Sequence, residues 1–306
     1  GSSEAFVDGD EVEPQDYFER FPQQATELGR LLGCEGPAVS TILSKPQEMP
    51  KFSVGDRLDD FDLLTELGKG AFATVYLARQ ISMQRIVALC GGVGGAKLAE
   101  GLQQCIGTDR LTLIVNSGDD FEHRGLPIWP DFDTVLYTLS GTANAEQGWG
   151  RAEESWAVQS EWRRLGIDTW FQLGDRDIAL HLLRREWLAQ GWSATRICAE
   201  LAALFKIPTR ILPMAERAAP TRVLTDQGEL DFQEYFVHRR CAPRVSGFRY
   251  GGAGQPAGAE AMTALADEQL AGIILCPSNP FLSLAPILAL EGVRARLRRT
   301  RAPVIA

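Results

Sequence analysis

The feature that most constrains this chain is a short apolar run that passes directly into a glycine-rich turn. Residues 86–90 are apolar and partly β-branched, and residues 91–97 read Gly-Gly-Val-Gly-Gly-Ala-Lys. The segment that follows, to Cys105, has the pattern of a helix, and residues 111–115 form a second buried-strand pattern. A strand, a glycine turn, a helix and a second strand make the βαβ unit of a parallel sheet. We therefore expect a three-layer α/β fold with parallel strands at residues 86–90, 111–115 and 273–276.

A glycine turn between a strand and a helix is typical of sites that bind phosphate. Glycines let the backbone approach an anion closely, and the helix N-terminus offers free N–H groups and a positive dipole end. The turn is not a Walker loop, because Lys97 is followed by Leu98 rather than by Ser or Thr. It also departs from the dinucleotide fingerprint, since Lys97 stands where the third glycine belongs. Glycines that serve only tight strand–helix packing are the alternative.

Aspartates occur in three segments with loop-like composition. Ligands of open α/β sheets bind beyond the carboxyl ends of the strands, where the first of these segments would lie. Magnesium prefers a few carboxylates together with substrate phosphate oxygens. The pattern favours a magnesium site, although any single aspartate is more often a helix cap, Asp133 in particular. The six aspartates are Asp119, Asp120, Asp131, Asp133, Asp175 and Asp177.

The segment before residue 86 has a different character. Residues 61–79, Phe-Asp-Leu-Leu-Thr-Glu-Leu-Gly-Lys-Gly-Ala-Phe-Ala-Thr-Val-Tyr-Leu-Ala-Arg, resemble the glycine-rich loop of a serine/threonine kinase. Residues 62–67 and 73–79 should therefore pair as a hairpin, with Ala73 in place of the third glycine. A kinase would continue with Val-Ala-x-Lys, but Cys90 stands at the lysine position, and no His-Arg-Asp or Asp-Phe-Gly follows.

These patterns divide the chain into three parts. Residues 1–51 are acidic, punctuated by proline and linker-like, with one short helix expected at residues 22–32. Residues 52–85 are the kinase-like β-hairpin fragment, and residues 86–306 are the Rossmann-like α/β body. The junction has the appearance of two unrelated genes joined together.

Composition and spacing exclude several other classes of protein. The chain has 306 residues, of which 45% are hydrophobic and 23% charged, so it can bury a core. A net charge of -9 argues against a sequence-independent nucleic-acid binder, and no Cys-x-x-Cys or His-Glu-x-x-His spacing predicts zinc. The apolar stretch at residues 271–290 is broken by prolines, and the first residues are no signal peptide. We expect a soluble, cytoplasmic protein with neither nucleic-acid nor membrane partners.

Six motifs follow one another in the α/β body, and their order is more specific than any one of them. They are Gly-Gly-Val-Gly-Gly-Ala-Lys-Leu at 91–98, Asn-Ser-Gly-Asp-Asp-Phe-Glu-His at 116–123, Pro-Asp-Phe-Asp-Thr-Val-Leu-Tyr at 130–137, Trp-Phe-Gln-Leu-Gly-Asp-Arg-Asp at 170–177, Phe-Gln-Glu-Tyr-Phe at 232–236 and Pro-Ser-Asn-Pro at 277–280. Together they resemble the 2-phospho-L-lactate transferase (CofD-like) family of coenzyme F420 biosynthesis, from about residue 86 to the end.

The resemblance implies a magnesium-dependent transfer. A guanosine diphosphate that carries a lactyl or enolpyruvyl group is attacked by the ribityl hydroxyl of the deazaflavin Fo, and GMP leaves. Such chemistry needs positioning and charge neutralisation more than a covalent nucleophile. A homodimer is a further expectation. Because relatives continue beyond the strand-like residues 302–306, the resemblance also implies that the family's C-terminal part is missing here.

The resemblance also assigns roles to residues. Asp133 matches the family's deazaflavin-contacting aspartate, and we expect it to serve the attacking hydroxyl as well, as the catalytic residue. Gln172 occupies the other deazaflavin-binding position, where relatives often have Arg or Lys. Asp119, Asp120 and Asp131 are the expected magnesium ligands. The nucleotide phosphates are expected to lie along Gly91, Gly92, Gly94, Gly95, Lys97, Ser278 and Asn279.

Two other functions stay open at this point. A nicotinamide-dependent oxidoreductase would use the glycine turn for the cofactor and Asp119 or Asp120 for its ribose, but the third glycine and a proton-relay pair are missing. A non-catalytic fusion would use the kinase-like fragment as an interaction segment, and the truncated body would merely fold. Binding of Fo, which only the transferase predicts, separates the three.

We expect no protein-kinase activity, because the phosphate-binding lysine and the catalytic and metal-binding aspartates are absent. Phosphate incorporation from labelled ATP into a generic protein substrate should equal the blank, with an active kinase as the positive control. Incorporation above the blank would contradict this reading of Cys90 and its surroundings.

Overall fold

The computed structural model describes residues 53–58, 61–69, 74–80 and 85–306. The chain divides into two compact units, Gly1–Asp56 and Arg57–Ala306. The helix expected at residues 22–32 and the tip of the kinase-like turn, residues 70–73, lie outside the described residues.

The predicted hairpin is confirmed. Strand β2 (Phe61–Lys69) pairs antiparallel with β3 (Thr74–Gln80), and the short β1 (Arg57–Leu58) pairs with the other edge of β2. These three strands form a sheet of their own, separate from the sheet of the α/β body. The two compact units divide at residue 56 rather than at about residue 86, so the predicted boundary at residue 86 stays a prediction.

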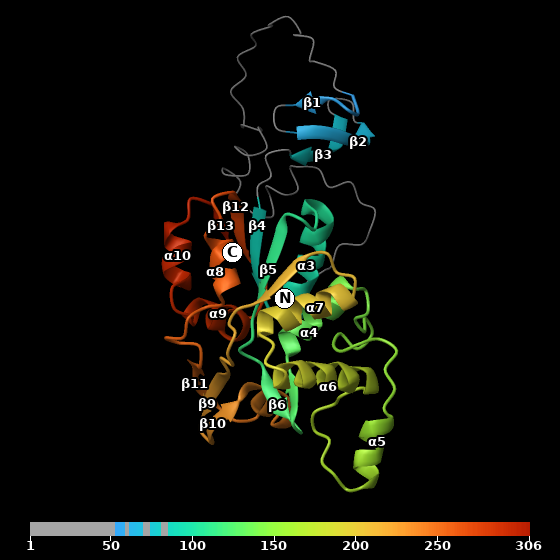
Figure 1. Cartoon of the computed structure of the whole chain (residues 1–306), viewed down its shortest axis with the longest axis vertical. Coiled ribbons are helices and arrows are strands. Elements are labelled where there is room, and N and C mark those ends of the chain that lie inside the picture. The colour runs from blue at the N-terminus through green and yellow to red at the C-terminus, as the bar shows by residue number, and fades with distance from the viewer. Residues whose placement is uncertain (1–52, 59–60, 70–73, 81–84) are drawn as a thin grey trace, which may run out of the picture. The chain divides into compact units, whose positions relative to one another are not determined.

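The α/β body is built on a parallel sheet of five strands, in the order β13-β12-β4-β5-β8. Every neighbouring pair in it is parallel (Figure 1). The three strands predicted from sequence are its centre. The strands are β4 (Arg85–Cys90), β5 (Leu111–Val115), β8 (Arg210–Pro213), β12 (Leu270–Leu275) and β13 (Val304–Ile305).

Helices cover both faces of this sheet, and Figure 1 shows one set on each side. One face carries α3 (Gly92–Ile106), α4 (Pro130–Leu139) and α7 (Ala194–Leu204), and the other carries α8 (Ala259–Leu265), α9 (Ala285–Ala289) and α10 (Val293–Arg299). Alternate residues of β4 divide between the two cores: Ala88 and Cys90 pack on the first face, whereas Val87 and Leu89 pack on the second. Side chains alternate along a strand, so a strand buried on both faces is apolar throughout.

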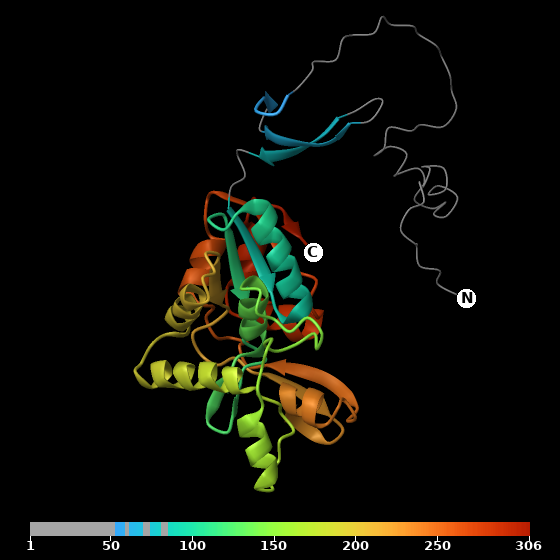
Figure 2. The ribbon, with the colours of Figure 1, turned by 90° about the vertical axis from the view of Figure 1, so that its right-hand side faces the viewer.

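The remaining elements lie beyond the carboxyl ends of the strands, and both views show them at that end of the sheet (Figures 1 and 2). Two small antiparallel sheets stand there, β6–β7 and β10-β9-β11. The elements are β6 (Phe121–His123), β7 (Leu126–Ile128), α5 (Ala157–Arg164), α6 (Asp175–Ala189), β9 (Thr221–Thr225), β10 (Gly228–Asp231), β11 (Val245–Tyr250) and the π-helical turns η1 (Glu234–His238) and η2 (Pro280–Leu284).

The sequence pattern predicted a helix that begins after the glycine run. Helix α3 instead begins inside that run, at Gly92. Its N-cap is Gly91 in extended conformation. A Cβ at Gly94 would overlap the backbone carbonyl oxygen of Pro277, and one at Gly95 would come within 2.7 Å of Ser278 Oγ. The first turn of α3 therefore packs directly on the loop after β12. At these two glycines the packing alternative holds, with the loop rather than a strand as the partner.

No helix among the described residues is long and apolar enough to cross a membrane.

Two glycines of α3 test this close approach. Gly94→Ala should lower the free energy of unfolding by about 1–3 kcal/mol, because the new methyl group must displace the Pro277 backbone. Gly101→Ala is the matched control in the same helix, and it should raise stability by up to about 1 kcal/mol, because nothing lies within 4 Å of its Cβ. Urea denaturation measures both, and equal effects of the two substitutions would contradict the packing argument.

Candidate active site

The centre of the candidate site is Asn116, the first residue after β5. Its side chain is buried, with 1% of the residue exposed. Its Nδ2 donates to Asp131 Oδ2 at 2.8 Å, to Asp119 Oδ1 at 3.1 Å and to the Leu282 carbonyl oxygen at 3.1 Å. Its Oδ1 accepts from the Gly118 N–H at 2.8 Å. One amide thus joins the turn after β5, the start of α4 and the η2 turn.

Asp131 connects this centre to the N-terminus of α3. The Gly92 N–H donates to Asp131 Oδ1 at 2.7 Å, and a Cβ at Gly91 would overlap the other carboxylate oxygen. Burial raises the pKa of Asp131 to about 6, against the hydrogen bonds from Asn116 and Gly92 that favour its charged form. Part of the anion-binding capacity of this helix end is therefore used by a carboxylate of the chain itself.

Three acidic side chains gather here. Burial raises the pKa of Asp119, and the charge of Asp131 raises it further. Burial also raises the pKa of Asp120, opposed by the charge of Arg184 and reinforced by the neighbouring aspartates. Asp120 Oδ1 is buried without a hydrogen-bond partner among the described residues. Like charges in low dielectric are costly unless a cation compensates them.

The donor set of this acidic cluster, Asp119, Asp120 and Asp131, fits a hard divalent cation, because it offers oxygen atoms only. Two further buried oxygens, Ser117 Oγ and Thr221 Oγ1, lack a hydrogen-bond partner within the described part of the chain. No group of three or more His, Cys, Asp or Glu among the described residues is arranged to hold a metal by itself. A magnesium ion would need water or phosphate oxygens in addition, which is its usual mode of binding.

The structure brings the predicted phosphate-binding residues of the two loops together. Ser278 Oγ donates to the Gly91 carbonyl oxygen at 2.7 Å, so it fixes the glycine turn. Asn279 Oδ1 accepts from the N–H groups of Phe281 and Leu282, and it caps η2. Lys97 is exposed on α3. Both loop side chains thus have structural contacts, and a phosphate role for them stays a prediction.

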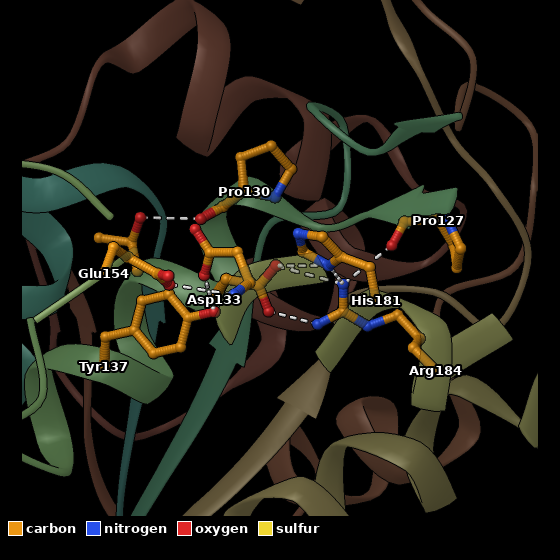
Figure 3. Close-up of polar contacts among 9 residues, drawn as sticks. Pro127, Pro130, Asp133, Tyr137, Glu154, His181 and Arg184 are labelled. Atoms are coloured by element: carbon orange, nitrogen blue, oxygen red, sulfur yellow. Dashed lines mark hydrogen bonds and ion pairs between the residues drawn. The ribbon is translucent and has the colours of Figure 1, made fainter. Parts of the chain in front are cut away.

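Asp133 lies two residues after Asp131 on α4 and belongs to a second polar group (Figure 3). Both of its carboxylate oxygens accept from the Arg184 guanidinium: Oδ1 from Nη2, and Oδ2 from Nη1 at 3.2 Å. Arg184 is fully buried, and its Nη1 also donates to the Pro127 carbonyl oxygen at 3.0 Å. The guanidinium carbon lies 4.5 Å from the centre of the Trp129 ring, a cation–π distance.

This geometry sets the tautomer of His181. Burial lowers the pKa of His181 to about 4, so the ring is neutral at pH 7. Arg184 Nη1 lies 3.1 Å from His181 Nδ1, and a guanidinium only donates. His181 Nδ1 is therefore the acceptor, and the ring proton is on Nε2.

A third contact joins α4 to α6. Tyr137 Oη donates to Asp177 Oδ1 at 2.5 Å, and burial raises the pKa of Asp177 to about 7. The Asp177 N–H donates to Glu154 Oε1 at 3.0 Å. Polar side chains of α6 therefore lie inside the protein, while Leu182 of the same helix is 50% exposed. Buried polar and exposed apolar side chains on one helix mark a surface built for more than packing.

The cap alternative for Asp133 is wrong. The N-cap of α4 is Trp129, and no side chain caps this helix end. Asp133 instead forms an ion pair with Arg184, a partner that the sequence did not suggest. Gln172 is exposed and has no hydrogen bond to Asp133, so the structure does not join the two predicted deazaflavin-binding residues directly. Their binding role stays a prediction.

The sequence pattern did not predict the central position of Asn116, whose amide binds Asp119 and Asp131, or the partners of Asp133. One signal was present: Asp177, His181 and Arg184 recur at i, i+4 and i+7, which places them on one helical face. A helix with a polar stripe on one side and leucines opposite reads as an ordinary surface helix. Only the contacts show that the polar stripe is the buried one.

The fold places the protein among the open α/β proteins, whose ligands usually bind at the carboxyl edge of the parallel sheet, and here a glycine-rich helix start lies at that edge. Comparison with known families identifies it more closely. The profile described as 2-phospho-L-lactate transferase CofD matches residues 86–306, and the chain belongs to this family. It is therefore a transferase, and the oxidoreductase alternative is set aside.

Relatives and solved structures agree with this assignment. The phosphoenolpyruvate transferase of Kitasatospora aureofaciens is 40% identical over 228 residues, covering 72% of this chain and 70% of the relative. The phosphoenolpyruvate transferase of Mycobacterium tuberculosis is 37% identical over 242 residues, covering 72% of each. Protein BH3568 of Bacillus halodurans has a similar fold, with a TM-score of 0.52, 16% identity, and coverage of 72% of this chain and 68% of that one.

The Asp133–Arg184 pair generates a stability prediction. Asp133→Asn leaves a buried guanidinium without its counter-charge, so we expect a loss of about 3 kcal/mol or more in the free energy of unfolding. A helix cap at position 133 would instead tolerate asparagine, because Asn and Asp cap about equally well. Arg184→Met should cost a similar amount, because it leaves Asp133 buried and unpaired.

The double variant with Asp133→Asn and Arg184→Met is the decisive measurement. It should be more stable than the sum of the single losses predicts, by about 1 kcal/mol or more, because neither charge is left alone. The exposed pair Arg210–Glu260 provides the control, since Arg210→Ala should hardly change stability. Strictly additive losses at positions 133 and 184 would contradict a direct ion pair.

Proposed function

We propose that this protein transfers a phosphoenolpyruvyl or phospholactyl group from a guanosine diphosphate conjugate to the ribityl hydroxyl of the deazaflavin Fo, with release of GMP. Membership of the CofD family supports the reaction class, and the names of the relatives support the enolpyruvyl form of the donor. The observation that carries the proposal is the buried acidic cluster around Asn116, beside the N-terminus of α3.

The transfer is one substitution at phosphorus. The hydroxyl oxygen of Fo bonds to the phosphorus that carries the enolpyruvyl group. The bond from that phosphorus to the oxygen that bridges to GMP breaks, and this oxygen leaves with GMP. The hydroxyl proton is released as the new bond forms. Little covalent chemistry falls to the protein, which must place the two substrates in line and balance their charge.

Asp119, Asp120 and Asp131 are the residues that would hold a magnesium ion, which would neutralise charge on the diphosphate. The Asn116 amide holds Asp119 and Asp131 in fixed orientations, so the cluster is already arranged before ligands bind. The Ser117 and Thr221 hydroxyls, which have no hydrogen-bond partner in the described part of the chain, are donors available to phosphate oxygens beside it. The backbone N–H groups in the first turn of α3 are of the same kind.

Asp133 would position the acceptor. Its carboxylate oxygens have lone pairs beyond those that Arg184 uses, and the hydroxyl groups of a ribityl chain are suitable donors. Arg184 fixes the orientation of this carboxylate, and α4 places it two residues from Asp131. The attacking hydroxyl would then lie between Asp133 and the acidic cluster. A role for Asp133 in accepting the hydroxyl proton belongs to the same proposal.

The proposal extends to the setting of the reaction. We place the enzyme in the cytoplasm, because both substrates are polar and soluble in water. We also expect it to act as a homodimer. Light scattering at micromolar concentration measures the second expectation, and a monomeric mass would contradict it.

The activity test uses the full chain with Fo, the enolpyruvyl–GDP conjugate and Mg²⁺, and it follows GMP release by chromatography and the new product by mass. Asn116→Ala should lower kcat by about a hundredfold or more, because it frees the two carboxylates that it orients. Asn144→Ala is the matched control, since Asn144 only organises an exposed turn. Chelation of the metal with EDTA should abolish turnover.

Three results would contradict the proposal or a part of it. Full turnover in EDTA would contradict the role of the metal. Absence of GMP release by a folded native chain would contradict the proposed reaction. An Asn116→Ala variant with unchanged kcat would show that the acidic cluster is not where transfer occurs.

A further inference from the structure

An aromatic cluster continues directly from the acidic turn. We give this name to Phe121, His123, Trp170, Phe171 and His238. Strand β6 follows Asp120 and carries the first two of these rings. The His123 ring centre lies 5.3 Å from that of Trp170, edge to face, and 5.5 Å from that of Phe171. Trp170 also stacks on His238, with ring centres 4.9 Å apart and planes inclined by 13°.

One atom of this cluster is unsatisfied. His123 is 8% exposed, and its Nε2 is buried without a hydrogen-bond partner among the described residues. Burial lowers the pKa of His123, which favours the neutral form of the ring. A buried polar atom without a partner costs free energy, and it calls for an explanation. The other buried histidine, His181, has its Nδ1 partner in Arg184.

Packing alone does not explain this histidine. The small core beneath the cluster consists of Leu126, Ile128 and Leu173, with Phe121 and Phe171 packed against it. A phenylalanine at position 123 would fill the same space without an unpaired nitrogen. A polar atom kept in an aromatic surrounding is what recognition of a flat, polar-edged ring requires, since stacking holds its face and a hydrogen bond reads its edge.

We propose that His123 is a specificity-determining residue for the acceptor: its Nε2 bonds the polar edge of a flat heteroaromatic ring that packs against Trp170. The inference rests on the proposed function. A deazaflavin ring has a pyrimidine-type edge with both N–H and C=O groups, so a neutral imidazole can pair with it in either tautomer.

The position along the chain suits an acceptor with a ring and a polyol tail. His123 is the third residue after Asp120 along an extended strand, a span of about 10 Å. The reacting hydroxyl at the end of the tail would lie at the acidic cluster, while the ring lies at the aromatic cluster. Trp170 is only half-buried, and Gln172, two residues after it, is exposed, so the aromatic cluster reaches the protein surface.

The test is a fluorescence titration of the full chain with Fo, without donor. His123→Phe keeps the ring shape and removes the nitrogen, so it should weaken binding about tenfold, the value of one hydrogen bond. His123→Gln returns a polar group near the Nε2 position and should lose less than the Phe variant. Trp170→Ala should weaken binding about tenfold or more, because it removes the stacking surface.

A stability measurement separates recognition from structure. His123→Phe should leave Tm unchanged or raise it, since it removes an unpaired buried atom, even as it weakens binding. A purely structural histidine would lose stability with its nitrogen. Trp192→Ala is the control: Trp192 forms a comparable stack with Trp187, with ring centres 4.9 Å apart, and should leave Fo affinity unchanged.

The outcomes distinguish this inference from the proposed function. Native chain that binds Fo, together with a His123→Phe variant of equal affinity, overturns the inference and leaves the transferase in place. A folded native chain that does not bind Fo overturns both. Equal losses in Trp170→Ala and Trp192→Ala would show a general effect of tryptophan removal, and would also overturn it.

Discussion

The side-chain amide of Asn116 joins three parts of the chain that lie far apart in sequence. It donates to Asp131 on α4, to Asp119 in the turn after β5 and to the backbone of η2. Two buried carboxylates of like charge would otherwise repel each other and rotate toward solvent. Because one neutral amide holds both, the acidic cluster exists before any ligand arrives. Preorganisation of this kind is what phosphoryl transfer asks of a protein.

A second buried interaction, the Asp133–Arg184 pair, lies at the same edge of the sheet. Arg184 is fully buried and loses its contacts with water. In their place its guanidinium makes a two-point ion pair with Asp133, a hydrogen bond to the Pro127 carbonyl oxygen and a cation–π contact with Trp129. A buried ion pair of this kind often contributes little net stability compared with apolar packing. What it does provide is a carboxylate with one orientation, two residues along α4 from the acidic cluster. The polar face of α6 is buried for the same reason, because Arg184 on that face holds the Asp133 carboxylate in place.

The glycine-rich turn serves the fold as much as any ligand. Gly94 and Gly95 let α3 approach the loop after β12, and Ser278 fixes that loop to the Gly91 carbonyl. Asp131 uses the first free N–H of the helix. The sequence pattern suggested an open cradle for phosphate, whereas the structure shows a helix end already joined to the acidic cluster. Both interpretations are compatible if a diphosphate contacts the N-terminus of α3 while a cation bound by the acidic cluster contacts the same diphosphate.

The sequence by itself determined the strand, glycine, helix and strand order, the parallel sheet, the hairpin before it, and the family, because each depends on local pattern or on motifs in register. It also indicated the carboxyl edge as the place of the site. Only the tertiary structure decided which partners Asp131 and Asp133 contact. Asp133 meets Arg184 across 51 residues, and Asp131 meets Gly92 across 39. Spacing along the chain fixes which side chains share a helix face, but which face is buried depends on how distant elements pack, and packing decides partner, charge and burial.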